Sequence, residues 1–418
     1  MSTDICLISS PETLQIYDAE SLCLRGTFAL HLSDKRNDKN PILFALAGND
    51  DHLVSTSGPF WFAHSFTKEQ PLYRTVLKNE LSAIAADKEG MFYAGGTRTG
   101  EFSIWDASTG ECLRSLSSHY KRITAIEFIE DFVVTVSEDS IIHIWQLGDL
   151  LDESMRHVVP YKSIMEHTSS ITGLYGYSGR FVTCSLDKSC RIRDMITGKL
   201  LLTLFIPAPV SCVVINPQET LLFAGCDNGD IYRINIFPSQ TIASGIVNAG
   251  DGELTHKFTS GSSAAVSTLR LSTDSTLLYS VTSDATLYKW DVLSGQKVSS
   301  TSISKTKITG STFCMEVIVK PSNLFSVTSW DKDVASQPPQ RTGTIPGSRI
   351  SAHIVLKSKA RTTTMHPQVI VQSTDDSSAA EIEKLKEDNK RLQTLFKNAQ
   401  TINDEMYAYI AKQDAVGK

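Results

Sequence analysis

Hydrophobic and polar residues alternate with a period of two along most of the first 320 residues of the chain. Between His119 and Leu147 the runs ITAIEFI, FVVTVS and IIHIWQL each alternate in this way, and polar turns separate them. Because successive side chains of a β-strand point to opposite faces, each run predicts a short strand with one buried face. Three or four such strands would form one small sheet.

This unit recurs along the chain. Alternating runs that end in an aromatic or bulky residue follow one another at steps of 40 to 56 residues, and their last bulky residues are Tyr17, Trp61, Trp105, Trp145, Arg193, Ile234 and Trp290. One sheet of this size cannot bury both of its faces, whereas sheets packed radially around an axis bury them against one another. The pattern therefore predicts an all-β, seven-bladed propeller over residues 1–320.

The two ends of the predicted propeller complement each other. The first unit starts with ICLIS and TLQIYD, which correspond to the second and third strands of the other units, so its first strand is missing. The run ITGSTFCMEVIV at 308–319 has the pattern of that strand. We expect 308–319 to pair into the first blade and to close the ring, since closure removes an open sheet edge.

A histidine and an aspartate recur at one spacing in two neighbouring units. His119 and Asp139 are 20 residues apart, as are His167 and Asp187, and the bulky strand residue follows six residues later. The six-residue spacing recurs between Asp284 and Trp290. His256 precedes Asp284, but by more than 20 residues. Such a pair could serve catalysis, metal binding or architecture. Its recurrence favours architecture, because a catalytic site is normally unique and buried polar groups need partners.

These residues resemble the WD repeat. The tripeptides IWD and KWD, the aspartate in the turn and the upstream histidine all match that family, although four of the seven units depart from Trp-Asp. The resemblance implies that His119 pairs with Asp139 and His167 with Asp187, in buried networks that include Trp145 and, in the last blade, Trp290 with Asp284. Arg193 stands where the family commonly has tryptophan.

Composition narrows the class further. The chain has 418 residues, a formal net charge of −6 and eight cysteines without a close CxxC pair. No nucleophile elbow, zinc-binding helix, phosphate loop or calcium loop occurs, and no secretory leader or membrane-spanning apolar run is visible. We expect an intracellular protein that is not an enzyme, with no catalytic residue, metal or cofactor.

The segment 321–377 has a different character. Its stretch 334–374 contains no acidic residue and carries five cations, Arg341, Arg349, Lys357, Lys359 and Arg361. One interpretation is a solvated basic linker, as its prolines and glycines indicate. The other is a partner-binding tail whose β-prone patches ISAHIVL and QVIVQ extend a partner's sheet while the cations contact RNA phosphates.

The last segment, 378–418, has a heptad pattern that predicts a coiled-coil dimerisation helix. Its core positions are Ile382, Leu385, Asn389, Leu392, Phe396, Ala399, Asn403, Met406 and Ile410. The two asparagines in the seam suit a parallel homodimer in one register. The alternative is a single amphipathic helix that packs on the propeller or on a partner.

The order of these segments resembles one family throughout, the WD-repeat subunit of the Rix/IPI pre-ribosome complex (the WD repeat-containing protein eighteen family). Its stretches SSHYKRITAIEF, IIHIWQLGDLLD and SLDKSCRIRDMITGKLLLTLFIPAPVSCVVI carry the resemblance. This implies a non-catalytic scaffold in the nucleus, in nucleolus and nucleoplasm, that acts in large ribosomal subunit assembly, in removal of the second internal transcribed spacer and in midasin recruitment.

The resemblance also implies partners: a Rix-type scaffold subunit of the proline-, glutamate- and leucine-rich protein type, a third helical-repeat subunit, the midasin AAA ATPase and the pre-ribosomal large subunit particle. Another reading remains open at this stage. A degenerate WD propeller could equally be a general adaptor, such as a ubiquitin ligase substrate receptor or a chromatin or replication platform.

Overall fold

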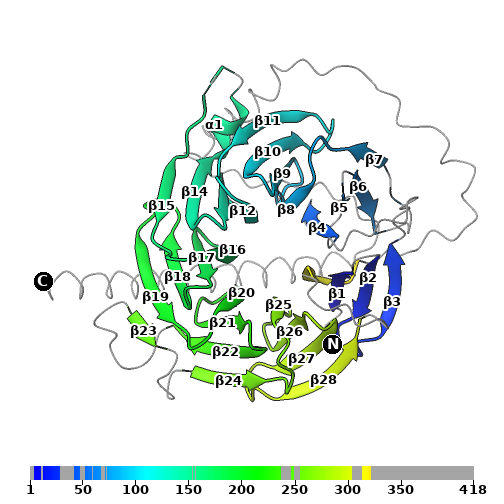
Figure 1. Ribbon diagram of the computed structural model, residues 1–418. Coiled ribbons are helices and arrows are strands. Elements are labelled where there is room, and N and C mark those ends of the chain that lie inside the picture. The colour runs from blue at the N-terminus through cyan, green and yellow to red at the C-terminus, as the bar shows by residue number, and fades with distance from the viewer. Residues whose placement is uncertain are drawn as a thin grey trace, which may run out of the picture. The chain divides into compact units, whose positions relative to one another are not determined.

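The computed structural model describes residues 4–10, 13–28, 42–47, 52–58, 60–66, 71, 73–152, 154–155, 157–236, 246–248, 255–303 and 313–321. These residues form seven small sheets, here called blades 1 to 7, arranged around one axis (Figure 1), and their strands are antiparallel except for one short strand at the rim of blade 5. The ring is the all-β propeller that the repeats predict. The predicted tail and dimerisation helix lie outside the described residues.

Each blade is a meander whose strands follow one another from the axis to the rim. Blade 1 contains β29 (Met315–Val319), β1 (Asp4–Ser9), β2 (Leu14–Asp18) and β3 (Leu24–Phe28). Blade 2 contains β4 (Leu43–Ala47), β5 (His52–Ser57), β6 (Phe60–Ser65) and β7 (Tyr73–Val76). Blade 3 contains β8 (Leu81–Ala86), β9 (Phe92–Thr97), β10 (Glu101–Asp106) and β11 (Cys112–Ser117). Blade 4 contains β12 (Ile123–Ile129), β13 (Phe132–Ser137), β14 (Ile141–Gln146) and β15 (Lys162–Met165).

The second half of the ring follows the same order with one addition. Blade 5 contains β16 (Ile171–Tyr177), β17 (Arg180–Ser185), β18 (Ser189–Asp194), β19 (Leu200–Phe205) and the short β23 (Ile246–Asn248). Blade 6 contains β20 (Val210–Ile215), β21 (Leu221–Cys226), β22 (Asp230–Asn235) and β24 (Thr255–Thr259). Blade 7 contains β25 (Val266–Leu271), β26 (Leu277–Thr282), β27 (Thr286–Asp291) and β28 (Lys297–Ser302).

The hydrophobic core lies between the blades. Adjacent blades share clusters of buried side chains, such as Phe102 and Phe128 with Trp145 between blades 3 and 4, because each alternating strand turns one row of apolar residues toward its neighbour. The cluster between blades 7 and 1 joins Tyr279 to Tyr17. Burial of these faces is the main stabilising contribution to a fold that has no single central core.

The ends of the propeller meet in blade 1. Strand β29 pairs antiparallel with β1, with Ile318 opposite Ile5, and so occupies the innermost position that the sequence leaves empty. The structure describes residues 313–319 of the segment expected to close the ring. A polar contact links blade 1 to blade 7, because the Asp4 carboxylate accepts a hydrogen bond of 3.0 Å from the Thr273 backbone N–H.

Two insertions explain the longest steps between units. The short helix α1 (Leu147–Leu151) lies between β14 and β15, and a long connection separates β22 from β24. Within that connection β23 pairs in parallel with β19, with Ile246 opposite Thr203, and extends blade 5 at its rim. The sequence analysis anticipated neither element. Among the described residues, no helix is long and apolar enough to cross a membrane.

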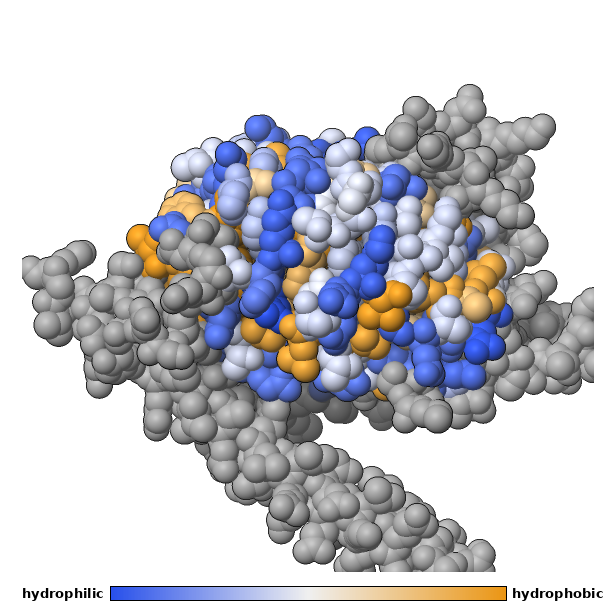
Figure 2. Space-filling view, turned by 90° about the horizontal axis from the view of Figure 1, so that it is seen from below, coloured by the Kyte–Doolittle hydropathy of each residue, from blue (hydrophilic) through white to orange (hydrophobic). Residues whose placement is uncertain are grey.

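The side of the ring where β24 and β28 lie in Figure 1 faces the viewer in Figure 2. Apolar residues form small patches there, separated by polar side chains. Two of the exposed apolar residues of blade 7 are Leu293 and Val298, whose exposed fractions are 81% and 56%. Isolated exposed apolar residues of this kind are usual on protein surfaces.

Candidate functional site

The most regular polar feature of the ring is a buried hydrogen-bond chain in blade 4. Trp145 Nε1 donates to Thr135 Oγ1 at 3.1 Å, and Thr135 Oγ1 lies 3.0 Å from His119 Nε2. His119 Nδ1 lies 3.0 Å from an Asp139 carboxylate oxygen, so it carries the proton and donates. The same carboxylate accepts the backbone N–H groups of Tyr120 and Ile141. The network that the WD resemblance implies is therefore present in this blade, with Thr135 as an additional member.

This arrangement leaves His119 no free nitrogen. Its side chain is fully buried and that of Asp139 is 6% exposed. Burial lowers the pKa of His119, and the neighbouring Asp139 offsets this only in part, so the imidazole stays neutral near pH 7. A general base must reach a substrate proton, and this histidine contacts only the fold itself. The geometry supports an architectural role for the pair.

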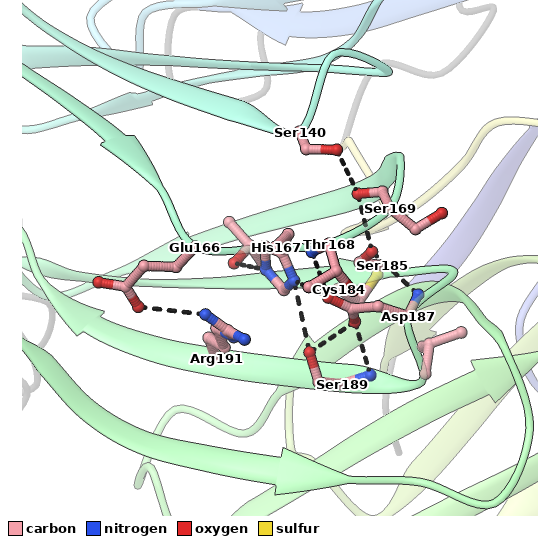
Figure 3. A network of polar contacts seen from close by, with 12 residues as sticks. Ser140, Glu166, His167, Thr168, Ser169, Cys184, Ser185, Asp187, Ser189 and Arg191 are labelled. Atoms are coloured by element: carbon pink, nitrogen blue, oxygen red, sulfur yellow. Dashed lines mark hydrogen bonds and ion pairs between the residues drawn. The ribbon is translucent and has the colours of Figure 1, made fainter.

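Blade 5 repeats the chain up to its last member (Figure 3). His167 Nδ1 lies 2.9 Å from Asp187, and His167 Nε2 lies 2.9 Å from Thr183 Oγ1. Arg193 replaces the tryptophan and is 1% exposed. Its guanidinium bonds to the Glu166 carboxylate, while its Nε has no hydrogen-bond partner. Blade 5 therefore stabilises a buried cation with a carboxylate that the sequence analysis did not single out.

The carboxylate in this network is strongly stabilised as an anion. Burial by itself raises the pKa of Asp187, but hydrogen bonds from His167 and Ser189 and from the Thr168 backbone N–H outweigh it. The net effect holds the pKa of Asp187 well below its usual range. Ser189 contributes its Oγ at 2.6 Å and its backbone N–H at 2.9 Å. Asp187 thus orders the turn that joins β17 to β18.

Blade 7 builds the same site with a different residue. Asp284 accepts a hydrogen bond of 3.1 Å from Ser262 Oγ, and Trp290 Nε1 donates to Ser280 Oγ at 2.8 Å. The expectation that His256 precedes this pair as its histidine is wrong. His256 is exposed on β24 of blade 6, opposite Arg233, because the insertion between β22 and β24 moves it to the preceding sheet.

Blade 2 holds a buried histidine without a carboxylate. His64 on β6 is fully buried, its Nε2 lies 3.0 Å from Ser55 Oγ, and its Nδ1 has no hydrogen-bond partner. Burial lowers the pKa of His64 to about 4. The imidazole is neutral at pH 7, and protonation would place an uncompensated charge in the core.

Charged residues of the innermost strands face the ring's axis. Arg270 on β25 forms two hydrogen bonds with Glu316 on β29, at 2.8 and 2.5 Å. Its guanidinium lies 5.9 Å from the ring centre of Tyr175 on β16. Glu127 on β12 belongs to the same group, and burial raises its pKa to about 7, against the opposing effect of Arg270. These residues couple four blades electrostatically.

Blade 3 lacks the network altogether. Trp105 occupies the same strand position as Trp145, but Gly95 stands where Thr135 supplies the hydroxyl, and Leu77, four residues before β8, stands where His119 precedes β12. A Cβ atom at Gly95 would lie 2.9 Å from the Trp105 ring, so the indole fills the space over the glycine. No hydrogen bond joins Trp105 Nε1 to a described residue. The sequence shows this difference at matched positions, yet the sequence analysis did not use it.

A pocket of about 440 Å³ opens where the network is missing, between blades 2 and 3. Its apolar part is formed by Trp61, Val76, Leu77, Leu81, Tyr93 and Trp105. Its polar wall is formed by Asn79, Glu101, Ser103 and Ser115, with Lys78 also in the lining. A mostly apolar pocket with a few placed polar groups is typical of binding sites in proteins.

The polar wall is organised around one carboxylate. Glu101 accepts a hydrogen bond of 2.6 Å from Asn79 Nδ2 and another of 2.6 Å from Ser115 Oγ. Ser115 Oγ in turn lies 2.8 Å from Ser103 Oγ. Across the pocket, the rings of Trp61 and Trp105 meet edge to face at 5.3 Å. No basic side chain of the described residues forms an ion pair with Glu101.

The remaining predicted residues are not part of these sites. Within the described ranges, no group of three or more His, Cys, Asp or Glu side chains is arranged to hold a metal ion. The predicted contact residues of the tail, Arg341, Arg349, Lys357, Lys359 and Arg361, lie outside the described residues. So do the predicted dimerisation residues, Ile382, Leu385, Asn389, Leu392, Phe396, Ala399, Asn403, Met406 and Ile410.

Comparison with known proteins agrees with the repeat structure. The model of the WD domain, G-beta repeat, matches residues 110–146, 159–194 and 252–291. These stretches contain the third strands of blades 4, 5 and 7, which carry Trp145, Arg193 and Trp290. Among solved structures, the computationally designed protein Ika8 aligns with a TM-score of 0.53 and 20% identity, over 73% of this chain and 86% of its own. That likeness concerns the fold alone.

Sequence relatives are more specific. The pre-rRNA-processing protein IPI3 of Yarrowia lipolytica is 28% identical over 272 residues, which cover 62% of this chain and 61% of the relative. WD repeat-containing protein 18 of Danio rerio is 28% identical over 55% of this chain and 54% of the relative. The chain therefore resembles the proteins named IPI3 and WD repeat-containing protein 18, at 28% identity to both over 62% and 55% of its length.

Similar proteins occur in fungi and in animals. The pre-rRNA-processing protein crb3/ipi3 of Schizosaccharomyces pombe is 27% identical over 332 residues, 69% of this chain and 73% of the relative. The matches to the Yarrowia and zebrafish proteins span little more than half of each relative's length. The resemblance read from the sequence is thereby confirmed at the level of the family.

Proposed function

We propose that this chain is a non-catalytic scaffold subunit that acts in pre-rRNA processing and in assembly of the large ribosomal subunit. The observation that carries the proposal is its similarity to relatives that bear the name pre-rRNA-processing protein in two distant yeasts. A closed seven-bladed ring suits this role, because it is a rigid body that offers the loops of seven sheets as separate contact surfaces.

The polar networks support the non-catalytic part of this proposal. The histidine–aspartate pairs of blades 4 and 5 are the residues with the strongest chemical signature, and both histidine nitrogens of each pair are occupied within the protein. Their side chains are fully buried. The residues that would otherwise suggest acid–base chemistry therefore stabilise the turns of the blades.

The finer parts of the proposal rest on the resemblance to the Rix/IPI subunit. We propose that the chain works in the nucleus, in nucleolus and nucleoplasm, with a Rix-type scaffold subunit of the proline-, glutamate- and leucine-rich protein type and a third helical-repeat subunit. In this view the complex binds the pre-ribosomal large subunit particle, supports removal of the second internal transcribed spacer and recruits midasin. The heptads at 378–418 would join two copies, which raises avidity for the particle without new contacts.

Affinity purification of the tagged full-length chain from nuclear extract tests the function. We expect the scaffold subunit, midasin and pre-rRNA that contains the second internal transcribed spacer among the recovered molecules. Depletion of the chain should cause precursors with that spacer to accumulate. Recovery of a ubiquitin ligase or a chromatin complex, with unchanged precursor levels after depletion, would reject the proposal.

The dimer is tested separately by mass measurement in solution. We expect the full chain to be a dimer and the double substitution Leu385→Asp with Leu392→Asp to make it a monomer, because charges in a heptad seam disrupt its packing. A matched control places the same charges at Lys384 and Lys390, which are outside the core and the e and g positions. A monomeric native chain would remove the coiled coil from the account.

A further inference from the structure

The pocket between blades 2 and 3 contains an anionic group without a counter-ion. Glu101 receives hydrogen bonds from the neutral donors Asn79 and Ser115, and no cation of the described residues pairs with it. Each of its oxygens still has a lone pair for a further donor. A half-buried carboxylate of this kind favours a positively charged ligand, since the pair would form in a partly desolvated site.

Three aromatic residues also line the pocket. Trp61, Tyr93 and Trp105 lie in contact with one another, with Trp61 5.1 Å from Tyr93 and 5.3 Å from Trp105. Their mutual packing leaves no cage for a compact ammonium group between the rings, so a ligand would lie on their outer faces and edges. A flat cation suits such a surface better than a spherical one.

A guanidinium group combines both requirements. It is planar and permanently charged, and it stacks on aromatic rings. Two of its N–H groups can donate parallel hydrogen bonds to the two oxygens of one carboxylate. The aliphatic part of an arginine side chain would lie against Val76 and Leu77 in the apolar lining. Trp105 Nε1, which has no partner among the described residues, would remain available as a donor to a backbone carbonyl of the same ligand.

We propose that this pocket binds an arginine side chain of a partner polypeptide, with the guanidinium paired with Glu101 and stacked beside Trp105. The local charge favours a polypeptide over RNA. Burial is the main cause that raises the pKa of the Cys112 thiol in the pocket lining, and the charges of Glu101 and Glu111 raise it further, against a smaller opposing effect of Lys78. Phosphate groups would meet net negative charge at this opening.

The replaced network residues account for the apolar character of the pocket. Leu77 stands at the position of His119 and lines the pocket. Gly95 stands at the position of Thr135 and is covered by the Trp105 ring, so that the indole has no internal hydroxyl to bond. The inference does not depend on the ribosomal role, because it concerns the isolated chain and a short peptide.

Ligand-observed NMR with the purified full-length chain tests the proposal. The probe is the peptide acetyl-Ala-Leu-Arg-Leu-Ala-amide, and its matched versions carry lysine or citrulline in place of arginine. We expect saturation transfer to the arginine side chain, and binding about tenfold weaker for citrulline, which keeps the shape but loses the charge. A five-nucleotide single-stranded RNA should not compete.

Substitutions in the pocket locate the binding. Glu101→Gln should weaken the arginine peptide about tenfold, whereas Glu111→Gln, which removes the same charge from an exposed neighbour, should leave the affinity within a factor of about two. Ser115→Trp, which fills the pocket from an exposed position, should also abolish binding. Circular dichroism checks that each variant is folded.

Several outcomes would overturn the proposal: equal affinity for the arginine and citrulline peptides, unchanged binding by both Glu101→Gln and Ser115→Trp, or RNA that displaces the peptide. Absence of detectable peptide binding at millimolar concentration would also reject it. None of these results bears on the recovery of pre-rRNA with the tagged chain, so the pocket and the ribosomal role fail independently.

Discussion

Blades 3 and 4 are neighbours with the same strand order and the same tryptophan position, yet they use the space beside that tryptophan in opposite ways. In blade 4, Thr135, His119 and Asp139 extend a hydrogen-bond chain from the indole to the turn. In blade 3, Gly95 supplies no hydroxyl and Leu77 stands at the histidine position, and a pocket of about 440 Å³ is lined by Leu77 and Trp105. The repeat therefore tolerates loss of its internal network, and an apolar residue takes the place of the histidine beside the pocket.

The polar residues of blade 4 contribute to stability, whereas those of blade 3 are available for recognition of a ligand. A buried network whose every donor and acceptor is paired contributes to folding and offers nothing to a partner. An open carboxylate next to aromatic rings contributes little to folding and can recognise a cation. Substitutions at matched positions of the two blades should therefore have opposite effects on stability and on binding.

The largest expected effect is that of Asp139→Ala in blade 4. It removes the acceptor of His119 and of two backbone N–H groups. Leaving the buried His119 N–H and the partly buried Ile141 N–H unpaired should lower the free energy of unfolding by about 3 kcal/mol. Equilibrium unfolding in urea measures this change. Glu138→Ala, which changes the neighbouring carboxylate of the same turn, is the control and should cost less than about 0.5 kcal/mol.

A second comparison concerns histidines with and without a carboxylate. The pKa of His64 is about 4 in the folded chain, whereas an ordinary histidine has a pKa of about 6.5 in the unfolded chain. As the pH falls below about 6.5, the unfolded chain therefore binds the proton first and the folded state loses stability. Between pH 7 and pH 5 the loss from this residue should be about 2 kcal/mol.

The variant His64→Gln should therefore flatten the decline in stability over that range. His52→Gln, an exposed histidine of the same blade, is the matched control and should leave the profile unchanged. Urea unfolding at five pH values between 5 and 7 gives both profiles. Identical slopes for the native chain and His64→Gln would contradict the assignment.

A substitution in blade 5 is expected to change stability less, and to raise it. Arg193→Trp restores the residue of blade 4, and its indole N–H would find Thr183 Oγ1 as Trp145 finds Thr135. Exchange of a buried ion pair for an apolar side chain of suitable shape should raise the free energy of unfolding by about 1 kcal/mol. Arg193→Ala, which leaves a cavity instead, should lower it by about 3 kcal/mol. A loss of stability in both variants would show that blade 5 has adapted to the arginine.

The smallest effect on stability is expected for Glu101→Gln in blade 3. The amide keeps the size of the side chain and can accept one of its two hydrogen bonds, so unfolding should change by less than about 0.5 kcal/mol. The same variant should lose most of its affinity for an arginine peptide. A large stability loss would instead assign Glu101 to the architecture of the blade.

Sequence periodicity was sufficient for the ring but not for its exceptions. The third strands were located by their bulky last residues, from Tyr17 to Trp290, because each must fill the gap between blades. The partner of Asp284 in blade 7 could not be found in this way, since an insertion of irregular length separates β22 from β24. Ser262 occupies the position that a histidine occupies in blades 4 and 5. The length of this insertion decides which residue lies next to Asp284, and the hydrophobic periodicity carries no information about that length.

The pocket was missed for a related reason. Motif searches look for residues that are present, and in blade 3 the network histidine and hydroxyl are replaced by Leu77 and Gly95. A comparison of the residues four positions before the first strand of each blade would have indicated the change, because blades 3 and 4 differ there. The ionic partner of Arg193 also needed the fold, as Glu166 lies on the connection between blades 4 and 5.

The central claim is that the histidine–aspartate networks are architecture and that function resides on the surface of the ring. The most direct test is the amount of spacer-containing pre-rRNA recovered per folded molecule of the Asp139→Ala chain, purified at low temperature beside the native chain. The account predicts equal recovery per folded molecule, although less folded protein is obtained. A marked fall in recovery at an unchanged folded fraction would contradict it and would make the His119–Asp139 pair part of the functional site.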